Sequence, residues 1–296
     1  MARYRLFGPL AMKRQKSFET PQPTLYIVAT PIGNLQELTP RARQILEEAD
    51  IIAAEDTRNT QKLLTHFGIS THMVTHHKFN EAQSSKGIIR LLTEGKSVAI
   101  VSDAGYPLIS DPGAQLVNEV IGAGYPVVPV SGSSAAMAAL VASGLPPQPF
   151  LFYGFLDSTE KQRIRQLLSL KEYPMTLIFY EAPHRIGKML QNCLDILGDR
   201  EMCLARELTK KHEEFIRGKI SEVLELCDQL KGEMVVVMAG HEEDKELDLT
   251  QAMPLIKEHI QRYIKEGMTT NEAIRKVARE QGLSKNEVYR QYHGLN

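Results

Sequence analysis

Two segments of the sequence place acidic, basic and hydroxyl side chains directly after short apolar runs. Residues 55–58, Glu-Asp-Thr-Arg, follow the run 51–54, and residues 102–113 follow the run 98–101. Carboxylates beside a guanidinium can orient a hydroxyl or a phosphate, and a carboxylate can also accept a proton. An Asp56–Arg58 pair that only braces the loop is the structural alternative.

The segment 102–113 contains two glycines and two prolines, at Gly105, Pro107, Pro112 and Gly113. Such a composition ends a strand abruptly and leaves backbone N–H and C=O groups unpaired at the carboxyl edge of a sheet, where open α/β sheets bind ligands. The structural alternative is a tight strand-to-helix connection in which Gly and Pro only satisfy the backbone geometry.

Two more segments of mixed charge follow strand-like runs in the second half of the chain. Residues 181–185, Glu-Ala-Pro-His-Arg, follow the run 176–180, and residues 206–211 follow the run 202–205. Charged groups at strand ends of both halves predict a cleft between two sheets. A solvated charge run is the alternative for residues 206–211.

Short β-branched runs alternate with helix-length segments from Leu25 onward, which is the spacing of a mostly parallel sheet covered by helices. The Pro-rich segment 144–149 predicts a domain boundary. The strands expected are residues 25–29, 51–54, 73–75, 98–101 and 127–130 before that boundary, and residues 150–153, 176–180, 202–205 and 234–239 after it.

Composition excludes several classes of protein. The chain has 296 residues, a net charge of −1 and only three cysteines, so neither a disulfide framework nor a general basic field is expected. Metal binding is not expected, because the adjacent His76 and His77 lack ligand spacing. No apolar run approaches the roughly 18 residues of a membrane span. A cytoplasmic protein without a membrane partner is predicted.

The two ends of the chain differ from its centre. Residues 1–23 are basic and lack an apolar period, which predicts a disordered lead-in before domains over residues 24–145 and 146–240. Residues 241–296 read as an acidic linker and a helical tail, in which Thr269 with Glu272 and Ser284 with Glu287 have capping-box spacing. This pair resembles a helix-turn-helix. Contact with nucleic acid and a helical hairpin that covers an apolar face or forms a dimer contact are equal alternatives.

The ordered motifs resemble the tetrapyrrole-methylase superfamily, most closely its bacterial members that act on small-subunit ribosomal RNA. No GxGxxG or Walker motif competes with this interpretation. The resemblance spans about residues 25–240 and continues into the tail, and the matching segments are residues 25–35, 53–58, 102–113, 144–146, 179–185 and 206–210.

The resemblance implies two α/β domains, with a parallel sheet in the first and a mixed sheet in the second, and a small helical C-terminal unit. It implies a homodimer that uses S-adenosylmethionine to methylate the ribose 2′-hydroxyl of a cytidine in the decoding region of 16S ribosomal RNA, whether free or in the small ribosomal subunit. Tyr106 and Ser131 depart from the family pattern, where a smaller residue and a proline are usual.

The implied site has a cofactor set and a catalytic set. We expect Asp56, Glu181 and Glu207 as acid–base groups, and the basic residues to hold RNA phosphates or a developing alkoxide. The predicted catalytic residues are Asp56, Arg58, Glu181, Arg206, Glu207 and Lys210, with Arg185 as a further cation. The predicted cofactor residues are Thr30, Pro31, Ile32, Asp103, Ala104, Gly105, Tyr106, Ile109, Ser110, Ser131, Ser133 and Ser134.

Two other functions remain possible from the sequence. A tetrapyrrole methyltransferase of the same superfamily would need a closed apolar pocket and no basic tail. A DNA-binding regulator would use the tail to read sequence and the α/β body to sense a ligand.

Overall fold

The computed structural model describes residues 14–17, 22–76, 81–111, 113–242, 249–280 and 283–293. These residues form two compact units, Met1–His241 and Glu242–Asn296. Most of the predicted lead-in and of the acidic linker lies outside the described residues. Of the lead-in, the Gln15 side chain pairs with the backbone of Val127 through two hydrogen bonds of 3.0 Å.

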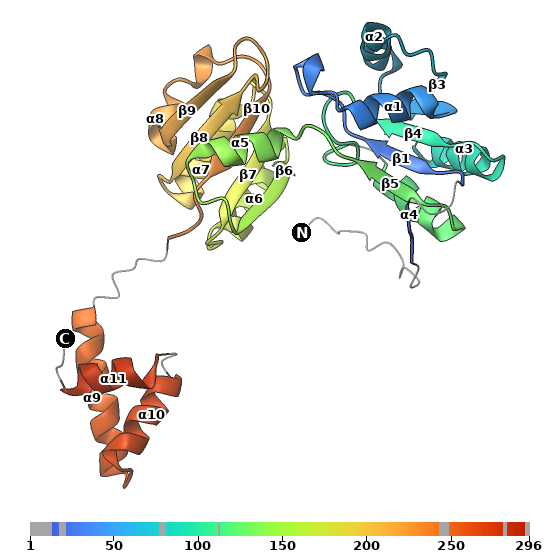
Figure 1. Cartoon of the computed structure of the whole chain (residues 1–296). Helices are drawn as coiled ribbons and strands as arrows, with labels where there is room; N and C mark the ends of the chain where they lie inside the picture. Colours follow the sequence, from blue (N-terminus) through green and yellow to red (C-terminus); the bar gives the residue numbers. More distant parts are fainter. Residues whose placement is uncertain are drawn as a thin grey trace. The chain divides into compact units, whose positions relative to one another are not determined.

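The first sheet has five parallel strands in the order β3-β2-β4-β1-β5 (Figure 1). Its strands are β1 (Leu25–Val28), β2 (Ile51–Ala54), β3 (Met73–Thr75), β4 (Val98–Val101) and β5 (Val127–Val130). The helices between them are η1 (Leu35–Glu37), α1 (Pro40–Glu48), α2 (Thr57–Phe67), α3 (Glu81–Thr93) and α4 (Ala114–Ala123).

Alternate strand residues bury opposite faces of this sheet, because successive side chains of a strand point to opposite sides. Val28 and Val101 pack with Leu46 of α1, whereas Ile27 and Ile100 pack with Leu92 of α3. Both faces are therefore covered by helices, and only the strand ends remain open for a ligand.

The second sheet is mixed, with the order β6-β7-β10-β8-β9, and only β6 and β7 are parallel. Its strands are β6 (Phe150–Phe155), β7 (Thr176–Glu181), β8 (Glu201–Arg206), β9 (Glu214–Lys219) and β10 (Met234–Met238). The fold class predicted from the sequence is confirmed. Strand β9 was missed because it is an edge strand rich in charge, as solvent-exposed edges often are.

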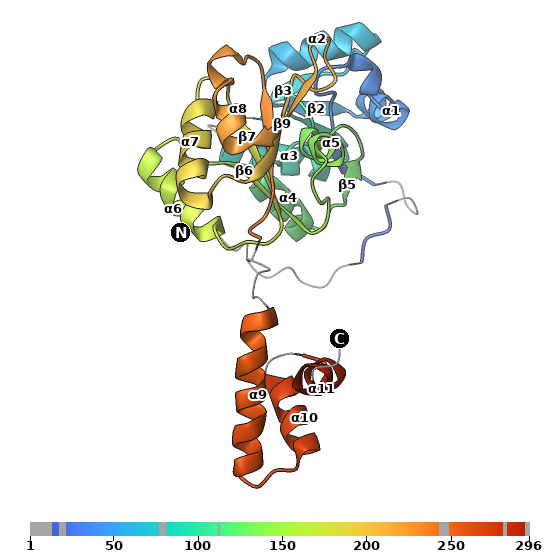
Figure 2. The same ribbon diagram turned by 90° about the vertical axis from the view of Figure 1, so that its left-hand side faces the viewer.

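Helices cover the two faces of the second sheet unequally. Helices α6 (Glu160–Leu170), α7 (Ile186–Leu197) and α8 (Ile220–Leu224), followed by η2 (Cys227–Gln229), lie on one face, and α5 (Ala135–Ser143) lies on the other (Figure 2). Helix α5 packs through Ala136, Ala139 and Leu140, although the predicted boundary at residue 145 would assign it to the first domain. That boundary stays a prediction.

The C-terminal unit contains α9 (Leu249–Lys265), α10 (Thr270–Glu280) and α11 (Lys285–His293) around a small core that includes Ile260, Ile274 and Val288. The carboxylate of Glu272 accepts the Thr269 N–H at 2.9 Å, and that of Glu287 accepts the Ser284 N–H at 2.8 Å, so both predicted capping boxes form. Within the described part of the chain, no helix is both long and apolar enough to cross a membrane.

Two glycines allow loops of the first sheet to contact the second sheet closely. A Cβ at Gly33, after β1, would lie 2.8 Å from Thr209 Oγ1 and 3.0 Å from the Leu208 carbonyl oxygen. A Cβ at Gly154, whose φ is +80°, would lie 3.0 Å from Ser110 Oγ. At the Gly33 contact, the Asn34 N–H donates a hydrogen bond of 3.0 Å to the same Thr209 Oγ1.

We expect Gly33→Ala to lower the free energy of unfolding by about 1–3 kcal/mol, since the new methyl group must displace the backbone after β8. Gly87→Ala is the matched control, because Gly87 lies in α3 with no heavy atom within 4 Å of its added Cβ. The control should raise stability by about 0.5–1 kcal/mol. Urea denaturation followed by circular dichroism measures both, and an unchanged midpoint for Gly33→Ala would contradict the proposed tight contact.

Candidate functional site

A cavity of about 440 Å³ lies between the loops of the first sheet and the strand ends of the second. Its lining comes from the loops after β1 and β4, from the start of α5, and from β6, β7, β10 and the turn after β8. The lining residues are Ile32, Asp103, Ala104, Gly105, Tyr106, Ile109, Ser110, Asp111, Ser134, Ala135, Phe155, Tyr180, Glu181, Ala182, Pro183, Leu208, Glu233, Met234 and Val235.

Backbone and phenol hydrogen bonds fix the loop after β4 against its neighbours. Thr30 and Gly105 exchange two backbone hydrogen bonds of 2.9 and 3.0 Å. The Gly132 N–H donates to the Tyr106 phenol oxygen at 3.2 Å, so the Tyr106 side chain joins the loops after β4 and β5. Ser131 contributes its carbonyl, which accepts the Thr39 hydroxyl at 3.3 Å.

The same loop holds two residues in the left-handed region that disfavours side chains other than glycine. Leu108 has a φ of 75° and Ser110 a φ of 67°. Such conformations cost free energy and persist where the surrounding structure enforces them, often at binding sites. They bracket Ile109, which is 49% exposed.

The cavity is acidic. Asp103 and Asp111 line it from the loop after β4, and Glu181 and Glu233 line it from the second sheet. The described lining contains no Lys, Arg or His. Burial raises the pKa of Asp111, and the neighbouring Asp103 raises it further. Burial likewise raises the pKa of Glu55, with smaller contributions from Asp111 and Asp103. This arrangement favours a ligand that carries positive charge.

Strand alternation separates Tyr180 from Glu181 at the end of β7. Tyr180 packs on the α5 face, and burial raises the pKa of its phenol, which keeps the hydroxyl protonated. The Glu181 side chain is 1% exposed and lies 3.1 Å from Arg185 Nε, at the start of α7. Glu181 Oε1 accepts the Ala182 N–H at 2.8 Å, and its buried Oε2 has no hydrogen-bond partner. Glu181 also lines the cavity, and burial raises the pKa of its carboxyl. Its predicted acid–base role stays a prediction.

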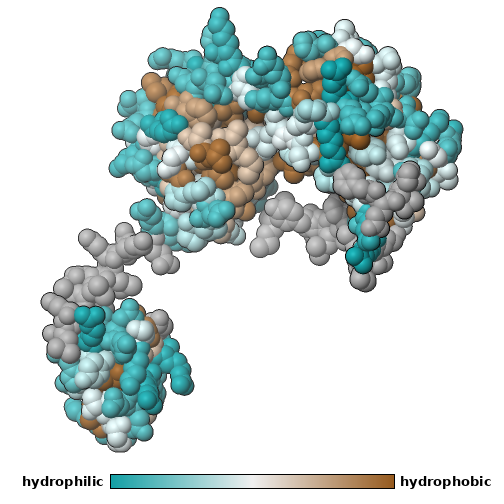
Figure 3. All heavy atoms as spheres, viewed as in Figure 1, coloured by the Kyte–Doolittle hydropathy of each residue, from teal (hydrophilic) through white to brown (hydrophobic). Residues whose placement is uncertain are grey.

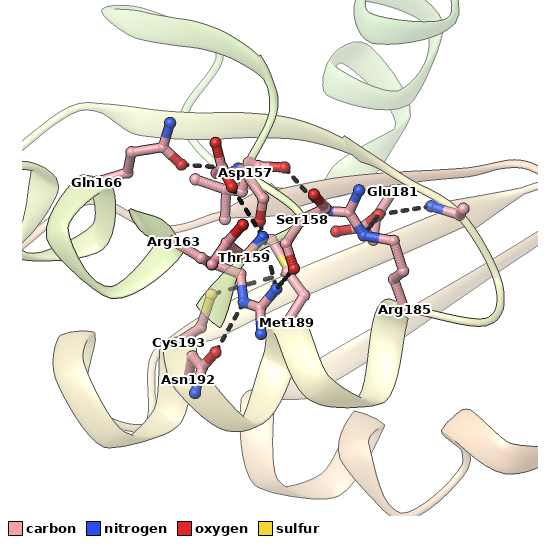
Figure 4. A network of polar contacts seen from close by, with 12 residues as sticks. Asp157, Ser158, Thr159, Arg163, Gln166, Glu181, Arg185, Met189, Asn192 and Cys193 are labelled. Atoms are coloured by element: carbon pink, nitrogen blue, oxygen red, sulfur yellow. Dashed lines mark hydrogen bonds and ion pairs between the residues drawn. The ribbon is translucent and has the colours of Figure 1, made fainter. Parts of the chain in front are cut away.

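A network of buried polar groups fixes the chain where it leaves β6 (Figure 4). Arg185 Nη2 donates to the Leu156 carbonyl at 2.7 Å, and the Asp157 N–H donates to Gln166 Oε1 at 2.8 Å. Arg163, which is 4% exposed, donates to the Asp157 carbonyl at 3.3 Å and to Asn192 Oδ1 at 2.7 Å. The backbone next to Phe155 in the cavity wall is therefore held by side chains from α6 and α7.

The structure brings together most of the predicted cofactor residues. Those that line the cavity are Ile32, Asp103, Ala104, Gly105, Tyr106, Ile109, Ser110 and Ser134. Thr30, Pro31, Ser131 and Ser133 are not part of the lining. Thr30 forms the bridge to Gly105, and the Ser133 hydroxyl donates to Glu37 Oε2 at 2.9 Å, so these two support the loops instead. Their contact with a cofactor stays a prediction.

Five of the six predicted catalytic residues lie outside the cavity lining. Asp56 caps α2, and its hydrogen bonds with Arg58 lower its pKa to about 2. Arg58 is itself 87% exposed. Asn59 of the same helix donates to the cavity residue Asp103 at 3.1 Å, which places this turn beside the cavity.

The other three lie at the end of β8, which Arg206 closes, and in the turn that follows, which holds Glu207 and Lys210. Arg206 pairs with Glu214, and Lys210 Nζ lies 3.1 Å from Glu207 Oε1. Hydrogen bonding to Lys210 lowers the pKa of Glu207, which weakens that carboxylate as a proton acceptor. All three side chains therefore have partners that brace the turn, and their catalytic roles stay predictions.

Sequence reasoning missed much of the second-sheet wall. Phe155, Tyr180, Leu208 and the start of β10 line the cavity from that sheet, and Asp111 lines it from the loop after β4. Asp111 lay inside the singled-out segment 102–113, so its polar type could have suggested it. The apolar residues carried no such signal. Among the described residues, no group of three or more His, Cys, Asp or Glu could hold a metal ion.

Comparison with known proteins identifies the family. The model of the Tetrapyrrole (Corrin/Porphyrin) Methylases matches residues 24–224. The chain belongs to the tetrapyrrole methylase family. This confirms the resemblance expected from the motifs.

Curated members of this family are similar over nearly the whole chain. A protein of Bacillus subtilis (strain 168) named ribosomal RNA small subunit methyltransferase I is 48% identical over 95% of this chain and 99% of its own. One of the same name from Micromonospora olivasterospora is 41% identical over 90% of this chain and 86% of its own.

Solved structures of other proteins share the fold at low sequence identity. Uroporphyrin-III C-methyl transferase from Thermus thermophilus, complexed with S-adenyl homocysteine, has a TM-score of 0.55 and 20% identity over 73% of this chain and 97% of its own. A diphthine synthase has a TM-score of 0.57 and 16% identity over 74% of this chain and 91% of its own.

We expect Asp111→Asn to make this tetrapyrrole methylase more stable at neutral pH. The pKa of Asp111 is raised in the folded state, so ionisation of this carboxyl lowers the free energy of unfolding as the pH rises through that pKa. Asparagine cannot ionise, and the difference in free energy of unfolding should shrink as the pH falls toward the ordinary aspartate range. Urea denaturation across this range measures it, with Asp195→Asn at an exposed position of α7 as the control. A difference in free energy of unfolding between Asp111→Asn and the parent that does not change with pH would contradict the raised pKa of Asp111.

Proposed function

We propose that the chain is an S-adenosylmethionine-dependent methyltransferase that methylates the ribose 2′-hydroxyl of a cytidine in the decoding region of 16S ribosomal RNA. The observation that carries this proposal is the 48% identity, over nearly both full chains, to a protein named ribosomal RNA small subunit methyltransferase I. The choice of a cytidine as target nucleotide, and of its 2′-hydroxyl as the methylated group, is implied by the motif resemblance.

The cavity suits this cofactor in size and in charge. Its volume of about 440 Å³ falls in the range of small-molecule sites. S-adenosylmethionine carries a sulfonium and an ammonium, which Asp103 and Asp111 can attract because no cation in the described lining competes with them. Ile32, Leu208 and Val235 supply apolar wall for the adenosine.

The residues of the chain then act mainly by positioning. When bound, S-adenosylmethionine supplies an electrophilic methyl group. The braced loop after β4 and the second-sheet wall hold the reactants in one geometry, which removes much of the entropic cost of a bimolecular reaction. Burial raises the pKa of two cavity carboxylates, Asp111 and Glu181. Because Glu181 is paired with Arg185, Asp111 is the proton acceptor that fits the hydroxyl best.

Cationic side chains offer contacts for RNA phosphate in both units. Arg58 is exposed beside the cavity. In the tail, Arg275 and Arg279 of α10 and Lys285 and Arg290 of α11 are also exposed. Phosphate contacts from such side chains bind RNA without requiring a basic protein overall. The nucleic-acid alternative for the tail is therefore part of this proposal.

A second copy of the chain is the proposed partner for the outer face of α5. This helix contains no charged residue, and its Val141 and Met137 are 77% and 39% exposed. Figure 3 shows hydrophobic residues gathered over this face. A helix that is apolar all round is normally buried, and the homodimer expected from the resemblance would bury it.

We expect Val141→Glu to convert a dimer into a monomer, because a carboxylate would be desolvated in the interface. Leu168→Glu is the matched control, since Leu168 of α6 is 56% exposed on a different face. Light scattering coupled to gel filtration gives the mass of each variant. A monomeric parent protein, or dissociation by both variants alike, would contradict the α5 interface.

The methylation proposal is tested with small subunits that lack ribose methylation and with labelled S-adenosylmethionine. Label should map to a cytidine ribose of 16S RNA. Arg58→Ala should raise the KM for subunits severalfold. It should also reduce, by about one, the slope of the logarithm of the binding constant against the logarithm of the salt concentration, as expected for one lost phosphate contact. Arg90→Ala, 80% exposed on α3, is the control and should change neither. Label transferred only to an added tetrapyrrole would overturn the proposal.

A further inference from the structure

An open groove of about 420 Å³ adjoins the cavity and has no charged residue in its lining. It is formed by Leu108, Ile109, Ser110, Phe152, Tyr153 and Phe155. Three of these, Ile109, Ser110 and Phe155, also line the cavity, so the groove and the cavity share one wall. An occupant of the groove would therefore extend directly into the cavity.

Phe155 is displayed at this junction by an irregularity in its strand. The pairing of β6 with β7 shifts register between Phe152 and Gly154, and Gly154 adopts a φ of +80°. Such bulges redirect the side chains that follow them and are common beside active sites. The Phe155 ring is 51% exposed and contacts the Tyr180 ring edge-on, with 5.6 Å between centroids.

Both sides of the junction are held in place. On the second sheet, Arg185 and Gln166 bond to the backbone of the two residues after Phe155, as Figure 4 shows. On the first sheet, the left-handed Leu108 and Ser110 turn the Ile109 side chain outward. An aromatic ring and a branched aliphatic side chain thus stand exposed at fixed positions, although exposure of both costs hydration free energy.

We propose that this groove binds the nucleobase of the nucleotide to be methylated, stacked on Phe155 against Ile109. Flat, half-exposed aromatic faces are the surfaces on which proteins stack unpaired RNA bases. A phosphate is disfavoured because the groove offers no cation, and a ribose joined to the bound base would lie at the shared wall. The inference rests on the proposed function and adds the base-binding subsite to it.

The adenine of the cofactor is the other nucleobase that could stack there. We assign the groove to the RNA base because both rim residues, Phe155 and Ile109, are about half exposed and accessible to a macromolecule. The cavity behind them already provides apolar wall for a small cofactor, through Ile32, Leu208 and Val235.

Kinetics with undermethylated small subunits test the stacking. Phe155→Leu keeps an apolar side chain but removes the aromatic face, so the KM for subunits should rise about tenfold or more. Because Phe155 also lines the cavity, the dissociation constant for S-adenosylmethionine, measured by calorimetry, should rise far less than the KM for subunits. Phe155→Tyr should restore the KM. Phe150→Leu is the control, because Phe150 is exposed on the same strand but lines neither the groove nor the cavity.

A fluorescence readout tests the site without methyl transfer. The chain contains no tryptophan, so Phe155→Trp introduces a single reporter into the groove. With S-adenosylhomocysteine present, a short single-stranded RNA containing the target cytidine should quench it, and the same RNA with an abasic ribose at that position should not. The equivalent reporter Phe150→Trp should respond to neither.

Four results would overturn the inference: an unchanged KM for Phe155→Leu, equal quenching by the abasic RNA, full quenching by S-adenosylhomocysteine alone, or conversion of a dimer to a monomer by Phe155→Leu. The proposed function fails separately, if the parent protein does not label 16S RNA. The ratio of the KM of Phe155→Leu to the KM of Phe150→Leu, together with the fluorescence quenching by RNA, tests the groove independently of the proposed function.

Discussion

The close approach of Gly33 to the turn after β8 is the constraint on which the site depends. Only a residue without a side chain lets the loop after β1 lie against Thr209 and the Leu208 carbonyl, and the Asn34 N–H bonds to Thr209 in the same place. A second glycine, Gly154, allows a similarly close approach to Ser110 of the loop after β4. These two contacts set the distance between the sheets, and the cavity is the space that they leave.

Within that space, charge and strain are concentrated on the first sheet, and apolar and aromatic surface on the second. The loop after β4 carries Asp103 and Asp111 and holds Leu108 and Ser110 in unfavourable backbone conformations. The second sheet presents Phe155 and Tyr180 on a backbone fixed from behind by buried polar groups. A cationic cofactor and a flat base are the two ligands that such a pair of walls accommodates, which unites the proposed function with the proposed groove.

Several charged residues near strand ends pair with neighbouring side chains of the framework, although Glu181 also lines the cavity. Glu181 follows a buried strand, as a catalytic carboxylate might, but the alternation of β7 turns its side chain toward α6 and α7, where it meets Arg185. Glu207 and Lys210 pair with each other in the turn that receives Gly33. Whether a charged residue faces a ligand or a neighbour depends on one step of strand register, and a sequence motif does not specify that step.

The sequence by itself determined the order of the elements, the α/β class, the capping boxes of the tail and the loop after β4 as a cavity wall. These follow from local rules, since apolar periodicity, helix capping and Gly-Pro turns act over a few residues. Only the tertiary structure decided that α5 packs on the second sheet, that β9 forms its edge, and that Phe155, Tyr180 and Val235 complete the cavity. Those residues lie far apart in the chain and are ordinary core types, so their role arises from packing between sheets that no local pattern records.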